Sequence, residues 1–308
     1  MNGRNSGILV LLLTISLLPH LIVAQPINDQ ENLKTRVILL GTGTPRPGPD
    51  RSGPATAIVY GDRVFLFDAG AGVMRRINQA GLPINGPEAT FITHLHSDHT
   101  LGYPDLILTT WVMRRVKPLE VYGPHGLQRM TDYILKAYSE DIKIRIEGLE
   151  REPANGYKVN VHEIEPGVIY DSSGVKITAI PVLHGDWKEA YGYRIDTPDR
   201  SIVISGDTRP CETLIEASTG VDILIHEVYT SSDVKIENRV GGDLWPKYLK
   251  AFHTSDVELG NIAEQSNPKL LILYHIVRSK ATDEDLINGI REGGFKGKVV
   301  IGKDLQTF

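Results

Sequence analysis

Residues 91–100 read FITHLHSDHT, so four potential metal ligands fall within six positions. The apolar residues before the first histidine predict a short strand, and the polar side chains begin where that strand ends. Side chains two apart in an extended segment point to the same side, so His94 and His96 can reach one ion together. Asp98 and His99 come where the chain must turn and can face a second ion. A cluster of this kind predicts a metal site.

Three further donors each follow an apolar run that predicts a strand. They are His184, Asp207 and His275, after the runs 175–183, 201–205 and 270–274. Taken singly, each could cap or solvate a loop. Together they converge if the sheet edges face one cleft, and a carboxylate such as Asp207 can bridge two ions about 3.5–4 Å apart.

The order of short apolar runs and helical periodicities predicts a mixed α/β protein. The early strands follow one another without helices between them, whereas helical segments separate the later strands. This order fits a layered fold with two packed sheets better than a singly wound parallel sheet. The length of 308 residues leaves one or two domains open. We expect strands at 36–40, 55–60, 63–67, 89–93, 119–122, 175–180, 191–195, 201–205, 221–225 and 270–273, and helices at 71–81 and 104–116.

Composition and charge exclude several classes of protein. Hydrophobic residues make up 41% and charged residues 23% of the chain, as in globular proteins with a sizeable core. The formal net charge of -5 gives no overall attraction to nucleic acid or to an anionic membrane. Cys211 is the only cysteine, so an intrachain disulfide and a zinc ribbon are both excluded. A metal site must therefore be built from histidine and carboxylate side chains.

The first 24 residues differ in composition from the rest of the chain. A basic Arg4 precedes an apolar stretch, and the small Ala24 ends the segment, as in a secretory signal peptide. We expect cleavage after residue 24, a hydrolase domain at 25–308 and a periplasmic or secreted location. The alternative is an N-terminal anchor that is retained. After cleavage, no remaining segment is expected to span a membrane.

The residues resemble the motifs of the metallo-β-lactamase fold. The resemblance rests on the H-x-H-x-D-H run, on Asp68 in FLFDAG at 65–70, on His184, on the Gly-Asp-Thr at 206–208 and on His275. Within that superfamily, LGTG at 40–43, VLHG at 182–185, YGY at 191–193, SGDTR at 205–209 and IHE at 225–227 are similar to the ribonuclease Z branch, which includes arylsulfatase-like enzymes. The resemblance implies a single-domain, four-layer αββα sandwich with a dimetal site along one edge of the sheets.

The resemblance also implies how the ligands divide between two ions. One ion takes His94, His96 and His184, the other takes Asp98, His99 and His275, and Asp207 bridges them. The family implies zinc. Manganese or iron stays open, because the same nitrogen and oxygen donors suit these metals.

Four other side chains receive roles by resemblance, and Asp98 receives a second one. Asp98 would also orient the attacking hydroxide, and His253 resembles a second catalytic histidine that protonates the leaving group, or else a residue at a helix entry. Glu227 would orient His253. Asp68 would orient the ligand loop. Arg278 stands one position closer to the last ligand than the phosphate-binding basic residue of ribonuclease Z.

The expected reaction is hydrolysis of a phosphodiester, as in an endonuclease or another phosphodiesterase. The tRNA-gripping arm of ribonuclease Z is absent, because a short hairpin leads from Tyr193 to Ser201. The expected partner is a small anionic ester or a nucleic-acid phosphodiester, with a homodimer as an open expectation. Sulfate ester hydrolysis is the first alternative, followed by lactone or β-lactam hydrolysis, and an inactive metal-binding scaffold is the alternative outside enzymes.

Overall fold

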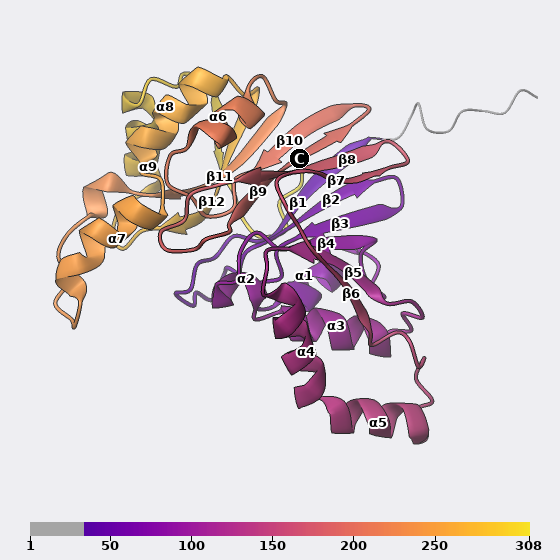
Figure 1. Ribbon diagram of the computed structural model, residues 1–308. Coiled ribbons are helices and arrows are strands. Elements are labelled where there is room, and N and C mark those ends of the chain that lie inside the picture. The colour runs from indigo at the N-terminus through magenta and orange to yellow at the C-terminus, as the bar shows by residue number, and fades with distance from the viewer. Residues whose placement is uncertain (1–33) are drawn as a thin grey trace, which may run out of the picture. The chain divides into compact units, whose positions relative to one another are not determined.

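The computed structural model describes residues 34–308 and contains two β-sheets (Figure 1). The first sheet has the order β1-β2-β3-β4-β5-β6, and the second has the order β13-β12-β11-β10-β9-β8-β7. The first sheet is made of β1 Thr35–Gly41, β2 Ala55–Tyr60, β3 Arg63–Phe67, β4 Ala89–Phe91, β5 Leu119–Gly123 and β6 Val159–Glu163. The second is made of β7 Gly167–Ser172, β8 Val175–Pro181, β9 Tyr191–Thr197, β10 Arg200–Ile204, β11 Ile223–Tyr229, β12 Leu270–Val277 and β13 Lys298–Ile301.

Both sheets are antiparallel in one part and parallel in the other. In the first sheet, β1, β2 and β3 pair antiparallel, and β3 to β6 pair parallel. In the second, β7 to β10 pair antiparallel, and β10 to β13 pair parallel. The parallel strands β4 and β10 end just before predicted ligands, and the predicted ligand His275 lies near the carboxyl end of β12. Loops at the carboxyl ends of parallel strands are where open α/β sheets place their sites.

Helices cover the outer face of each sheet. Apolar residues of α1, α3 and α4 share a core with the first sheet, and those of α6, α8 and α9 share a core with the second. The helices are α1 Val73–Gln79, α2 Ser97–Thr100, α3 Tyr103–Val112, α4 Leu127–Ala137, α5 Ser139–Glu147, α6 Glu212–Ser218, α7 Trp245–Phe252, α8 Asp256–Ser266 and α9 Asp283–Glu292, with short 3-10 turns at η2 Ser231–Asp233 and η3 Gly242–Leu244. Ser255 and Glu258 form a capping box that starts α8.

Aromatic side chains fill the space between the two sheets. The ring of Tyr193 in β9 lies 5.5 Å from Phe67 in β3 and 5.8 Å from Phe91 in β4, measured between centroids. All three side chains are buried. Because this contact joins the inner faces of the sheets, the layers run helix, sheet, sheet, helix. The predicted αββα architecture is confirmed.

The structure differs from the sequence-based prediction at several elements. Strands β6, β7 and β13 were not predicted, since they lie at or near sheet edges and are only partly buried. The helix predicted over 104–116 ends at Val112, and Arg114 adopts a left-handed backbone with φ of 73°. The predicted signal peptide lies outside the described residues. In residues 34–308, no helix is both long and apolar enough to cross a membrane.

Candidate metal centre

Three imidazole nitrogens lie close together, two from residues that follow β4 in the first sheet and one from a residue that follows β8 in the second. Nδ1 of His96 lies 3.0 Å from Nε2 of His94 and 3.1 Å from Nε2 of His184. One ring nitrogen from each of these histidines and a carboxylate oxygen of Asp207 all lie within 4.8 Å of one another. Zinc–nitrogen bonds are about 2.0–2.1 Å long, so one ion fits among nitrogens at this spacing. The structure brings together the three histidines that the resemblance assigned to one ion.

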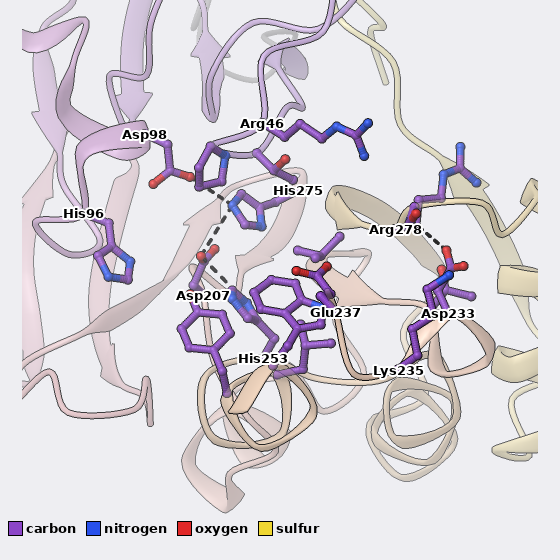
Figure 2. A pocket seen from close by; sticks show the side chains of 18 of the residues that line it. Arg46, His96, Asp98, Asp207, Asp233, Lys235, Glu237, His253, His275 and Arg278 are labelled. Carbon is purple, nitrogen blue, oxygen red and sulfur yellow. Dashed lines mark hydrogen bonds and ion pairs between the residues drawn. The ribbon is translucent and has the colours of Figure 1, made fainter. Parts of the chain in front are cut away.

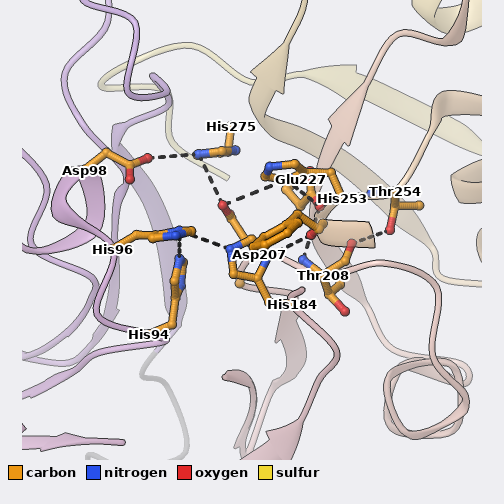
Figure 3. A network of polar contacts seen from close by, with 12 residues as sticks. His94, His96, Asp98, His184, Asp207, Thr208, Glu227, His253, Thr254 and His275 are labelled. Atoms are coloured by element: carbon orange, nitrogen blue, oxygen red, sulfur yellow. Dashed lines mark hydrogen bonds and ion pairs between the residues drawn. The ribbon is translucent and has the colours of Figure 1, made fainter. Parts of the chain in front are cut away.

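A second group lies beside the first. Oδ2 of Asp98 is 3.2 Å from Nε2 of His275 and 3.5 Å from Nε2 of His99. The carboxylate of Asp207 faces the same two nitrogens, with Oδ1 3.4 Å from His99 and Oδ2 3.5 Å from His275. Asp207 therefore lies between the two groups, as Figure 3 shows, where a carboxylate can bridge two ions.

The chemistry of these atoms fits divalent ions. Nε2 of His99 and Oδ1 of Asp207 are buried and have no hydrogen-bond partner among the described residues. An unpaired polar atom in such a place costs free energy unless something binds it. Burial also lowers the pKa of His94 well below its usual value and that of His184 to about 4. Both rings are therefore neutral at pH 7, which is the form that binds a metal.

Unusual backbone conformations aim two of the functional side chains. The register of β12 against β11 shifts at His275, so this residue is the extra one in a bulge. His275 has a φ of 42°, and Asp68, directly after β3, has a φ of 60°. Residues other than glycine seldom adopt this region, and bulges commonly redirect a side chain near a site.

Buried acceptors hold the ligand rings in place. The carboxylate of Asp68 accepts hydrogen bonds from the backbone N–H and the hydroxyl of Thr93, at 2.8 and 3.0 Å. It also lies 2.8 Å from Nδ1 of His99. When Nδ1 of His99 donates this bond, Nε2 keeps its lone pair for a metal. Nδ1 of His184 similarly lies 2.7 Å from the carbonyl oxygen of Phe252.

His253 lies at the end of α7, beside the ligand groups. Its Nδ1 is 3.3 Å from Oε1 of Glu227 and 3.9 Å from Oδ2 of Asp207. Burial lowers the pKa of His253, but the Glu227 carboxylate and Asp207 outweigh this effect and the net shift is upward. Glu227 also accepts the backbone N–H groups of Thr208 and Thr254, at 3.2 and 3.1 Å. The same carboxylate thus contacts the ring of His253 and holds the loop that follows Asp207 through hydrogen bonds.

A cavity of about 430 Å³ opens onto these side chains (Figure 2). Arg278 lines it, but Nη1 of this residue lies 2.6 Å from Oδ1 of Asp283. Several other residues of its wall were not predicted from the sequence, among them Arg46, Lys235, Trp245 and Tyr248. For the two aromatic residues a signal existed, since aromatic residues at 245, 248 and 252 share one helical face directly before the histidine at 253.

Comparisons with known proteins identify the family of this chain. The model of the beta-lactamase superfamily domain matches residues 63–276. Ribonuclease Z of Mycobacterium marinum is 34% identical over 279 residues, covering 88% of this chain and 96% of that protein. Ribonuclease Z of Mycobacterium bovis is 33% identical over 276 residues, with the same coverage.

Solved structures share the fold at lower identity. The metallo-beta-lactamase fold protein YhfI from Bacillus subtilis has a TM-score of 0.67 and 18% identity, and the short form of human tRNase Z has a TM-score of 0.65 and 22% identity. Each comparison covers 89% of this chain and 98% of the other. The sequence matches extend over most of the chain, so this protein belongs to the ribonuclease Z family of the β-lactamase superfamily.

Proposed function

We propose that this protein hydrolyses phosphodiester bonds with two divalent ions, for which zinc is the first candidate. The observation that carries the proposal is the position of Asp207 between two complete ligand groups, with His253 3.9 Å from its carboxylate. The relatives named ribonuclease Z support the same chemistry.

Different residues of the chain have separate roles in such a reaction. Ions bound here would lower the pKa of a coordinated water toward roughly 7 and polarise the ester oxygen. Asp98 orients the nucleophile from the ligand group that it shares with His275. His253 protonates the departing oxygen, and Glu227 keeps that ring protonated and aligned. A general acid in this position is worth about 10²–10⁴ in rate.

The hairpin of β9 and β10 supports a substrate other than precursor tRNA. In those ribonuclease Z enzymes that carry a tRNA-gripping arm, the arm is inserted between the motifs that His184 and Asp207 resemble. Here Tyr191–Thr197 and Arg200–Ile204 pair antiparallel with only two residues between them. A sulfate ester is the second candidate substrate, because a sulfuryl group presents a similar tetrahedral anion to the same ligands.

We also propose that residues 1–24 export the chain to the periplasm or the medium. The basic Arg4, the apolar stretch and Ala24 support this proposal. N-terminal sequencing of the protein from the producing cells tests it, since a mature chain that starts at Gln25 is expected. A homodimer stays a prediction, which light scattering of the purified protein checks.

The function is tested by purifying the mature chain, loading it with zinc and counting bound metal. Bis(p-nitrophenyl) phosphate, p-nitrophenyl sulfate, an aryl lactone and a cephalosporin are then assayed side by side. We expect about two zinc ions per chain and hydrolysis of the phosphodiester. Faster hydrolysis of the sulfate would assign the second candidate. Hydrolysis of none of the four by a fully loaded protein would favour an inactive scaffold.

A further inference from the structure

Two of the three histidines in the first ligand group, His94 and His184, hold the tautomer that binds a metal. The hydroxyl of Thr93 donates to Asp68, so its oxygen accepts a hydrogen bond from Nδ1 of His94, at 3.0 Å. Nδ1 of His184 donates to the carbonyl oxygen of Phe252. Nε2 of each ring therefore keeps its lone pair and faces the third histidine of the group. Metal-binding histidines almost always donate their outer N–H in this way.

His96 is the exception in this group, because a donor contacts its outer nitrogen. The indole N–H of Trp187 donates to Nε2 of His96, at 2.8 Å. An indole nitrogen can only donate, and a neutral imidazole has one N–H and one lone pair. Nε2 of His96 accepts the bond with that lone pair, so the hydrogen of this ring is on Nδ1. Nδ1 is the atom that lies 3.0 Å from His94 and 3.1 Å from His184 (Figure 3).

The hydrogen on Nδ1 of His96 lies where the ligand atoms converge. Nε2 of His94 and of His184 can accept it, so the hydrogen bonds of the metal-free network are complete. An ion at this position needs the lone pair of Nδ1 instead. The hydrogen would then be on Nε2, and the N–H groups of His96 and Trp187 would face each other across 2.8 Å. The hydrogen bond from Trp187 and an ion at His96 therefore exclude each other.

The indole of Trp187 has room to move, whereas its backbone is held. The backbone N–H of Trp187 donates to the carbonyl oxygen of His184, at 3.1 Å. The side chain is only partly buried. It lines a groove of about 560 Å³ whose wall includes residues of α4. The ring can therefore turn away from His96 without a change in the ligand loop.

We propose that Trp187 is a positioning residue that competes with the metal ion for His96. Its indole holds the ring of His96 in the metal-free chain and leaves it when an ion binds. The proposal rests on the metal site of the proposed function, and not on the substrate or the reaction. The net contribution of one hydrogen bond corresponds to about 2- to 10-fold in affinity. Trp187 should therefore weaken the binding of this ion by that factor.

The indole N–H signals of the ¹⁵N-labelled protein test the movement directly. The chain has three tryptophans, whose signals are assigned with phenylalanine variants. In protein stripped of metal by a chelator, the N–H proton of Trp187 should resonate downfield, because it is hydrogen-bonded. Addition of zinc should move it upfield and speed its exchange with water. The signal of Trp111 should stay in place, since its N–H donates to the carbonyl oxygen of Pro153, at 2.9 Å.

Zinc affinity tests the competition. Trp187→Phe keeps an aromatic ring but lacks the N–H, so it should bind the ion of the first ligand group about 2- to 10-fold tighter. Competition with a chromophoric chelator measures this affinity. Trp245→Phe is the matched control, because the ring of Trp245 stacks on Tyr248 and not on a ligand, and it should keep the affinity of the unaltered protein. The thermal unfolding midpoint of each metal-free variant shows that it is folded.

The possible failures of the two proposals differ. A Trp187 signal that stays in place while zinc binds would overturn the competition, and so would a zinc affinity that is unchanged or lowered in Trp187→Phe. Either result leaves the metal count and the phosphodiester assay unaffected. Failure of the unaltered protein to bind zinc at all would instead overturn the metal centre, and this proposal with it.

Discussion

The two sheets contribute to the metal centre in different ways. The first sheet supplies four predicted ligands from one segment, between His94 and His99. The second supplies three predicted ligands from three separate strands or the loops after them, at His184, Asp207 and His275. Each ligand group nevertheless contains residues from both sheets. The site is therefore complete only when the two sheets are packed together. The three separate residues of the second sheet should control its assembly as strongly as the cluster at 94–99 does.

Replacement of Asp207 by alanine gives the largest expected effect and tests how the contributions of the two sheets are joined. Asp207 faces both ligand groups, so Asp207→Ala should remove both ions and lower activity by well over the roughly 10–100-fold expected of an outer-shell change. Emission spectrometry of zinc per chain and a phosphodiester assay measure the two losses. Asp132→Ala, at an aspartate of α4 away from the site, is the control. A variant that retains about two ions would contradict the bridging position.

Replacement of His253 separates the effect on catalysis from the effect on metal binding. His253→Ala should slow turnover by roughly 10²–10⁴-fold, because the variant lacks the proposed general acid. The zinc content should stay unchanged, since His253 is assigned to neither ion. The same two measurements apply as for Asp207→Ala. Metal loss equal to that of Asp207→Ala would show that His253 is a ligand instead.

Replacement of Asp68 tests whether the cluster at 94–99 depends on the carboxylate that contacts it. In Asp68→Asn an amide N–H₂ can face Nδ1 of His99, which favours the tautomer whose Nε2 carries the hydrogen. The ion at His99 should bind about 10–100-fold more weakly, while the ion at His94 and His96 is retained. Titration with a chromophoric chelator resolves the two ions. Parallel weakening of both would mean that Asp68 supports the whole loop.

Asp199 tests a contact between the sheets far from the metal and should give the smallest effect. Its carboxylate accepts hydrogen bonds from the backbone N–H and the hydroxyl of Thr35 in β1, at 3.0 and 2.6 Å. Asp199→Ala should lower the free energy of unfolding by about 1 kcal/mol, because the side chain is exposed. Zinc content should not change. Urea unfolding followed by circular dichroism measures the loss.

The pH dependence of this contact has a definite sign. Burial raises the pKa of Asp199, but hydrogen bonds from Thr35 outweigh it, so the net shift is downward. The contribution to stability is therefore fully present above the unfolded pKa of about 4 and is lost as the pH falls through the lower folded pKa. The difference between the unaltered protein and Asp199→Ala should vanish under strongly acidic conditions. A difference that persists there would assign the effect to packing.

The same contrast explains what the sequence could predict. The order of strands and helices and the cluster at 94–99 are local features, so a layered fold with two packed sheets and a metal-binding cluster could be predicted from the residues, whereas the αββα arrangement was implied by the resemblance. His184, Asp207 and His275 could be named as donors because each follows an apolar run, but only the resemblance assigned them to particular ions, since their meeting depends on strand pairing over long separations. The bulge at His275 and the backbone of Asp68 gave no local signal. The aromatic residues at 245, 248 and 252 have a helical period, but nothing in that pattern indicated that Trp245 and Tyr248 face a cavity.

The left-handed backbone of His275 has a consequence for engineering. Glycine or asparagine would occupy that conformation with less strain, so either should raise the heat resistance of the metal-free chain while removing a ligand. Selection of a mutant library for thermal tolerance alone should therefore discard the histidine at 275. Retention of histidine there requires selection for metal-dependent turnover, and sequencing the survivors of the two selections would show which demand governs that position.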